Sequence, residues 1–182
     1  MRVIAGQAKG TPLQTVPGSG TRPISDRVKE ALFDVLAGEV PGARVLDLFA
    51  GTGSVGIEAL SRGAAQAVFV EKQSKAVATI RTNLQRTGLM DRARVVKADV
   101  FRFLGGEPEP FDLVYVAPPQ YLGLWKQTLV ALDSHSGWVV EDGGTVVVQI
   151  CPKEWEGLTL DELRLVDERR YGSTLLAFYE KG

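Results

Sequence analysis

The sequence has 182 residues, of which 45% are hydrophobic and 24% charged, and these values exclude disordered, collagen-like and membrane-spanning classes. A single cysteine, Cys151, excludes an internal disulfide, and a single histidine disfavours a histidine-based metal site, so we expect no metal. The net charge is −1, but residues 1–102 carry 15 basic and 9 acidic side chains, a surplus that suits a polyanionic partner. Since the chain has neither a long apolar run nor an apolar leader at its start, we expect a cytoplasmic protein.

The N-terminal residues 1–40 are predicted to form an extension of the main fold. Segments 2–5 and 13–16 are predicted to pair as a small β-hairpin. A helix is predicted over 26–37, because apolar residues recur on one stripe and Ser25 can cap the first turn. The stripe consists of Val28, Ala31, Leu32, Val35 and Leu36.

From residue 44 onward, short Val-rich runs alternate with segments of helical period, which is typical of β-α-β units around a mostly parallel sheet. The predicted strands span 44–49, 66–71, 93–98, 111–116, 144–150, 162–169 and 174–179. The predicted helices between them span 54–62, 73–87 and 122–133. The last two strands are separated by only four residues, so they form an antiparallel hairpin. The sequence therefore predicts an α/β fold with seven strands, as a single domain over 1–182 whose core is 41–182.

A glycine-rich segment follows the first predicted strand. Gly51, Gly53 and Gly56 match Gly-x-Gly-x-x-Gly between a strand and a helix, the context in which this motif holds a cofactor. Glu71 ends the second strand, where an acid can accept hydrogen bonds from ribose hydroxyls. These features suit a nicotinamide dinucleotide or S-adenosylmethionine. The candidate cofactor-binding residues of the loop are Phe49, Ala50, Gly51, Thr52, Gly53 and Gly56.

Two further acidic residues discriminate between these two candidate cofactors. Asp47 precedes the first glycine by four residues, where it would repel a pyrophosphate and attract the sulfonium and ammonium of S-adenosylmethionine. Asp99 follows the third strand, where it can accept from an adenine amino group or cap a short helix over 100–104. With Glu71, these acids stand at three successive strand ends, which favours S-adenosylmethionine.

The segment after the fourth strand, Ala117-Pro118-Pro119-Gln120-Tyr121, resembles the Asp/Asn-Pro-Pro-aromatic motif of methyltransferases that act on exocyclic amines. In that motif the first side chain and the first proline carbonyl accept hydrogen bonds from the amine, which promotes a pyramidal, attacking nitrogen, and the aromatic ring stacks on the base. Here Ala117 offers no side-chain acceptor, and Tyr121 follows one residue late, after Gln120. The candidate catalytic residues are Ala117, Pro118, Pro119 and Tyr121.

Beyond this motif, the chain is similar over nearly its whole length to the RsmD-type family of bacterial 16S rRNA guanine-N2 methyltransferases. The matching segments are 2–6 (RVIAG), 9–10 (KG), 21–23 (TRP), 26–33 (DRVKEALF), 47–53 (DLFAGTG) and 58–64 (EALSRGA). The resemblance implies a Rossmann-like class I methyltransferase fold, S-adenosylmethionine as donor with S-adenosylhomocysteine as product, and a guanine of 16S rRNA or the small ribosomal subunit as acceptor. It also implies that Arg22 and Arg27 contact RNA, although either arginine could instead anchor the extension through an ion pair. We further expect Tyr121 to contact the RNA and the protein to be a monomer.

Two other functions stay open at this point. The departures at Ala117 and Gln120 suit a non-catalytic RNA-binding or ribosome-assembly factor that retains the cofactor pocket. The glycine loop and Glu71 alone also suit an NAD-dependent oxidoreductase. Cys151 is predicted to be a packing or surface residue, and Trp125 is a possible contact at the rim of the site.

Overall fold

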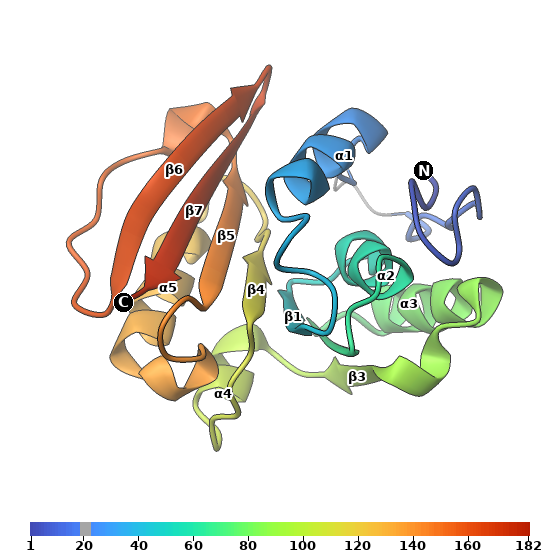
Figure 1. Ribbon diagram of the computed structural model, residues 1–182, viewed down its shortest axis with the longest axis horizontal. Coiled ribbons are helices and arrows are strands. Elements are labelled where there is room, and N and C mark those ends of the chain that lie inside the picture. The colour runs from blue at the N-terminus through green and yellow to red at the C-terminus, as the bar shows by residue number, and fades with distance from the viewer. Residues whose placement is uncertain (19–22) are drawn as a thin grey trace.

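A computed structural model describes residues 1–18 and 23–182, in which a seven-stranded sheet lies between helices (Figure 1). The strands are β1 (Arg44–Leu48), β2 (Gln66–Glu71), β3 (Ala93–Lys97), β4 (Leu113–Val116), β5 (Thr145–Ile150), β6 (Leu163–Tyr171) and β7 (Thr174–Lys181). The helices are α1 (Asp26–Val35), α2 (Ser54–Ser61), α3 (Ser74–Thr87), α4 (Val100–Leu104) and α5 (Leu124–Ser134), with short 3-10 turns η1 (Met90–Arg92), η2 (Ser136–Trp138) and η3 (Pro152–Glu154).

The strand order is β3-β2-β1-β4-β5-β7-β6. Neighbouring strands from β3 to β5 are parallel, whereas β7 is antiparallel to both β5 and β6. The hairpin of β6 and β7 therefore closes one edge of the sheet, as Figure 1 shows. The predicted fold class, with its reversed C-terminal strands, is confirmed.

Alternation along the strands gives the sheet two buried faces. In β4, Leu113 and Tyr115 belong to a core shared with α1, α2 and α3, whereas Val114 and Val116 belong to a second core with α4 and α5. Successive side chains of a strand point to opposite faces, so a run of apolar residues fills both cores at once. This explains why the central strands read as nearly continuous apolar sequence.

Residues with positive φ set several element ends. Phe49 (φ 58°) ends β1 one residue earlier than predicted, and Gly88 (φ 71°) caps the C-terminus of α3, which ends at Thr87 as the predicted range does. Helix α5 begins at Leu124 rather than at residue 122, because Tyr121 (φ 64°) and Gly123 (φ 67°) adopt left-handed conformations that a helix does not accept.

The N-terminal segment differs from the predicted hairpin over 2–5 and 13–16. Only Arg2 and Pro12 form an isolated antiparallel bridge in the described part of this segment. The backbone N–H groups of Ile4 and Ala5 instead donate to the Glu58 carboxylate, at 2.8 and 3.1 Å. Within the segment, the Val3 N–H donates to the Thr11 carbonyl (3.0 Å) and the Leu13 N–H to the Met1 carbonyl (3.0 Å). The segment is therefore bonded both to itself and to α2.

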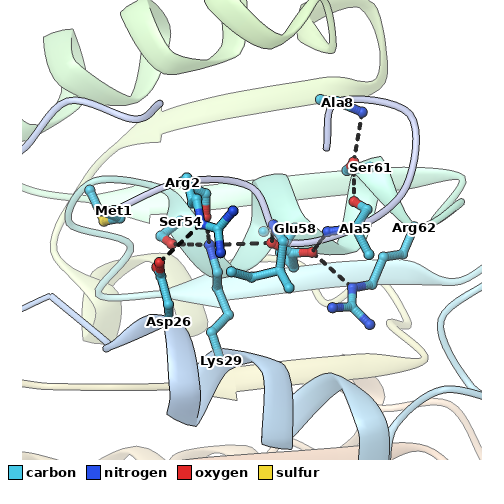
Figure 2. A network of polar contacts seen from close by, with 12 residues as sticks. Met1, Arg2, Ala5, Ala8, Asp26, Lys29, Ser54, Glu58, Ser61 and Arg62 are labelled. Atoms are coloured by element: carbon cyan, nitrogen blue, oxygen red, sulfur yellow. Dashed lines mark hydrogen bonds and ion pairs between the residues drawn. The ribbon is translucent and has the colours of Figure 1, made fainter. Parts of the chain in front are cut away.

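A buried ion pair joins this segment to two helices (Figure 2). Lys29 Nζ lies 3.2 Å from Glu58 Oε1, and both side chains are fully buried. The ammonium also donates to the Arg2 carbonyl (2.7 Å) and to Ser54 Oγ (3.0 Å), while Arg62 Nε donates to Glu58 Oε2 (2.8 Å). Burial lowers the pKa of Lys29, and attraction by Glu58 opposes that shift. The pair thus ties α1 and the N-terminus to α2.

Candidate active site

The glycine loop leads from β1 into α2 through three left-handed residues, Phe49, Gly51 (φ 57°) and Gly53 (φ 80°). The Gly51 N–H donates to Glu71 Oε1 at 3.0 Å, so the acid that ends β2 holds the turn. A Cβ added at Gly51 would meet no described atom within 4 Å, whereas one at Gly53 would lie 3.3 Å from the Ile57 and Ile80 side chains. Gly51 is therefore where the backbone lies open to an approaching ligand.

Asp47 stands beneath this loop, near the carboxyl end of β1. Its side chain is 2% exposed, and its Oδ2 accepts a hydrogen bond from the Gly56 N–H at 3.1 Å. Burial raises the pKa of Asp47 to about 8, and the Gly56 N–H offsets only part of that shift. A cation placed beside this carboxylate would favour its charged form.

Gly56 lies inside α2 and serves packing rather than an open turn. A Cβ at this position would lie 2.4 Å from Phe69 Cε1 and 3.2 Å from Asp47 Oδ2. The third glycine of the motif therefore lets α2 approach β2 closely and brings its N–H to Asp47.

Replacing Gly56 with Ala is expected to lower the free energy of unfolding by about 1–3 kcal/mol, because the buried Phe69 ring must move. Urea denaturation measures this loss, and Gly38→Ala is the matched control, because a Cβ at Gly38 meets no described atom within 4 Å. A Gly56→Ala protein as stable as the wild type would contradict the close packing.

A cavity of about 1080 Å³ opens above the loop and the carboxyl ends of β1, β4 and β5. Four walls surround it: the N-terminal end of α1, the glycine loop, the segment after β4, and the turn between β6 and β7. Its lining includes Arg27, Asp47, Phe49, Ala50, Gly51, Thr52, Tyr115, Ala117, Pro118, Pro119, Gln120, Tyr121, Gln149, Cys151 and Tyr171. Most of the predicted site residues thus surround one space.

Other predicted residues lie outside that lining. Gly53 and Gly56 are buried behind the loop, and Glu71 reaches the site only through its bond to the Gly51 N–H. Asp99 is exposed and caps α4, since its Oδ1 accepts from the Phe101 and Arg102 N–H groups at 2.9 and 3.2 Å. An adenine contact by Asp99 stays a prediction. Arg22 falls outside the described residues.

Tyr121 is fixed beside the cavity by contacts to the segment that follows β5. Its N–H donates to Glu154 Oε1 (2.7 Å), and its hydroxyl lies 3.1 Å from Cys151 Sγ. This contact lowers the pKa of the Cys151 thiol and raises that of Tyr121. The tyrosine remains 64% exposed, so its ring is available to a substrate.

Sequence reasoning missed several residues of the cavity. Cys151 lines it and contacts Tyr121, so it is more than a packing residue. Tyr115 and Gln149 also line it, and their side chains are hydrogen-bonded to each other across neighbouring strands. Trp125 is 1% exposed and stacks on Trp155, away from the rim. Period-two alternation in β4 could have placed Tyr115 on the Asp47 face, but the contact to Gln149 requires the strand order.

Residues 1–18 and 23–182 meet neither the requirements of a membrane span nor those of a metal site. No helix in those ranges is both long and apolar enough for a bilayer span. They also hold no cluster of three or more His, Cys, Asp or Glu side chains that could bind a metal ion.

The chain is similar to a known protein family, to proteins of known sequence and to solved structures. Residues 1–180 match the family described as Conserved hypothetical protein 95. The Ribosomal RNA small subunit methyltransferase D of Escherichia coli is 38% identical over 142 residues, which cover 78% of this chain and 71% of that protein. A solved structure of a Thermus thermophilus protein of unassigned function (TM-score 0.76, 37% identity) covers 98% of each chain. An RNA methyltransferase of Salinibacter ruber, solved with S-adenosyl-L-homocysteine, shares the fold at TM-score 0.68 and 16% identity, over 88% of this chain and 94% of that one.

Proposed function

Because the chain belongs to the Conserved hypothetical protein 95 family of RsmD-type methyltransferases, we propose that it methylates the exocyclic N2 of a guanine in 16S rRNA, with S-adenosylmethionine as donor. The buried Asp47 carboxylate beneath an open glycine turn carries this proposal, because a cation is the ligand that such a carboxylate favours. The name of the Escherichia coli relative supports an rRNA substrate in the small subunit.

The residues of the cavity fit this donor. Asp47 would face its positive groups, and Gly51 would let it approach the backbone. Glu71, outside the cavity lining, would hold the Gly51 turn in place. S-adenosylmethionine supplies a methyl group activated on a sulfonium. Transfer forms an N–C bond from the amine lone pair, breaks the S–C bond with its electrons left on sulfur, and releases one proton to water. Arg27, exposed at the cavity wall, would contact RNA phosphate.

The test is transfer of a tritiated methyl group from S-adenosylmethionine to small ribosomal subunits of a strain that lacks the enzyme, with N2-methylguanosine identified by mass spectrometry. Gly51→Val is expected to weaken S-adenosylhomocysteine binding at least about tenfold, because its side chain enters the cavity. Gly88→Val is the matched control: it has a similar positive φ (71°) and lies at the end of α3, outside the cavity lining.

Ala117 favours one second candidate, a non-catalytic RNA-binding or assembly factor that retains the cofactor pocket. Normal binding of S-adenosylhomocysteine without methyl transfer to subunits or naked rRNA would support that function and contradict ours. An oxidoreductase fits the site less well, because a cation favours the charged form of the buried Asp47, whereas a dinucleotide pyrophosphate would bind only with Asp47 protonated.

A further inference from the structure

The segment after β4 leaves the proposed reaction short of one hydrogen-bond acceptor. Ala117 is half-buried in the cavity wall and has only a methyl side chain, so this segment offers the Pro118 carbonyl to the amine. An exocyclic amine carries two protons, and hydrogen bonds to both localise its lone pair for attack. Gln120 of the same segment also lines the cavity, but its side chain is exposed, so a better positioned second acceptor must come from another element.

The neighbouring strand places a polar side chain beside the gap. Strands β4 and β5 are parallel, with Val116 opposite Val148, so the next residues along this register are Ala117 and Gln149. Gln149 is half-buried and lines the same cavity as Ala117 and Pro118. Its amide oxygen is thus an acceptor at the carboxyl end of the strand adjoining Ala117.

Tyr115 orients this amide. It lies opposite Asp47 in the β1–β4 register and is 4% exposed, and its hydroxyl donates to Gln149 Oε1. An amide oxygen has two lone pairs, so one receives the Tyr115 hydroxyl and the other remains for a substrate N–H. The contact also fixes the rotamer of Gln149, which reduces the entropy that a long side chain loses when it binds.

We propose that Gln149 is a catalytic residue that supplies, through Oε1, the amine acceptor missing at Ala117, and that Tyr115 is its positioning residue. The inference rests on the proposed methyl transfer. Gln149 accepts a hydrogen bond and does not take up the proton, which passes to water. Its amide N–H groups can also donate to guanine N3, the ring nitrogen beside the amine that carries no hydrogen, a contact that an ionised aspartate at position 117 could not make.

The experiment compares kcat, KM and S-adenosylhomocysteine affinity in single and double variants. Gln149→Met, of nearly the same volume, is expected to lower kcat by about 100-fold, the effect of removing one transition-state hydrogen bond. Its affinity for S-adenosylhomocysteine should stay within about twofold of the wild type, since its role lies with the amine. Gln149→Glu keeps an oxygen acceptor and should retain most activity. Gln127→Met, on the exposed side of α5, is the control and should leave all three quantities unchanged.

Rescue of the activity of Gln149→Met by a second substitution distinguishes a catalytic role of Gln149 from a structural one. Ala117→Asp should raise the kcat of Gln149→Met by about tenfold or more, because it restores an acceptor, and should improve the wild type much less. Tyr115→Phe should lower kcat with little change in KM. Unchanged kcat in Gln149→Met, equal losses of activity and S-adenosylhomocysteine affinity, or failure of the rescue would overturn the role of Gln149. A wild-type protein that transfers no methyl group to rRNA would overturn the proposed function itself.

Discussion

Asp47→Asn is expected to weaken S-adenosylmethionine binding by about 100-fold or more at pH 8, because the attraction between a buried carboxylate and a nearby cation is worth several kcal/mol. Asparagine has nearly the same shape, and its side-chain oxygen can still accept the Gly56 N–H that Asp47 accepts at 3.1 Å. The loss therefore reports the charge and not the loop geometry. Isothermal titration calorimetry measures it.

The pH dependence of wild-type binding provides a second signature of Asp47. Its pKa is raised to about 8 in the free protein, so this carboxyl is mostly protonated at pH 6 and must lose its proton when a cation binds. Apparent affinity should rise by up to about tenfold per pH unit from pH 6 to 8 and then level off. Titrations in buffers of different ionisation enthalpy should detect the released proton. The slope should be absent from Asp47→Asn.

The raised pKa of Asp47 also predicts how the stability of the ligand-free protein changes with pH. The folded-state pKa lies above the ordinary value of 3.8, so the folded protein binds the extra proton between about pH 4 and pH 8. The contribution of Asp47 to stability therefore falls as pH rises through this range. In urea denaturation, the free energy of unfolding of Asp47→Asn should increase relative to that of the wild type from pH 5 to pH 8.

Asp112→Asn serves as the control for these measurements. Asp112 is exposed just before β4 and accepts the Arg44 N–H at 2.8 Å, so its charge is remote from the loop. Asp112→Asn should change neither the affinity for S-adenosylmethionine nor the dependence of that affinity on pH. If Asp47→Asn bound S-adenosylmethionine with wild-type affinity and slope, Asp47 would not be the group that faces the cation.

The elements of the sheet could be predicted because each central strand fills two cores and so reads as an unbroken apolar run. The glycine loop could be located because Gly51 and Gly53 need positive φ directly after a strand. Both signals are local in the sequence. They placed the glycine loop directly after β1, where Gly51 lines the cavity.

What the sequence could not provide are contacts between distant segments. Gln149 reaches Tyr115 only because β5 lies beside β4, and the turn at Tyr171 lines the cavity only because β7 folds back along β5. Lys29 was also missed, since a lysine next to an apolar stripe predicts a solvated position. Its burial depends on Glu58, which is 29 residues away.

Glu58→Leu is expected to lower the free energy of unfolding by about 3–5 kcal/mol, because it leaves the buried Lys29 ammonium without its anion. In a chain of this length, that loss corresponds to a fall in Tm of roughly 6–20 °C. It also frees the N–H groups of Ile4 and Ala5, so the N-terminal segment should become sensitive to proteolysis. Thermal denaturation and limited proteolysis measure the two effects.

A double variant distinguishes the effect of an unpaired buried charge on stability from the effect of lost packing at the Lys29–Glu58 pair. Lys29→Met combined with Glu58→Gln removes both charges while leaving an oxygen that accepts from the N-terminal N–H groups, so it should be more stable than Glu58→Leu. Asp26→Asn breaks the exposed pair with Arg2 and should cost at most about 1 kcal/mol. Equal losses in Glu58→Leu and Asp26→Asn would show that the buried pair does not hold α1 to α2. A larger loss confined to Glu58→Leu would mean that the position of α1 in the cavity wall depends on the buried Glu58 carboxylate and the groups that it binds.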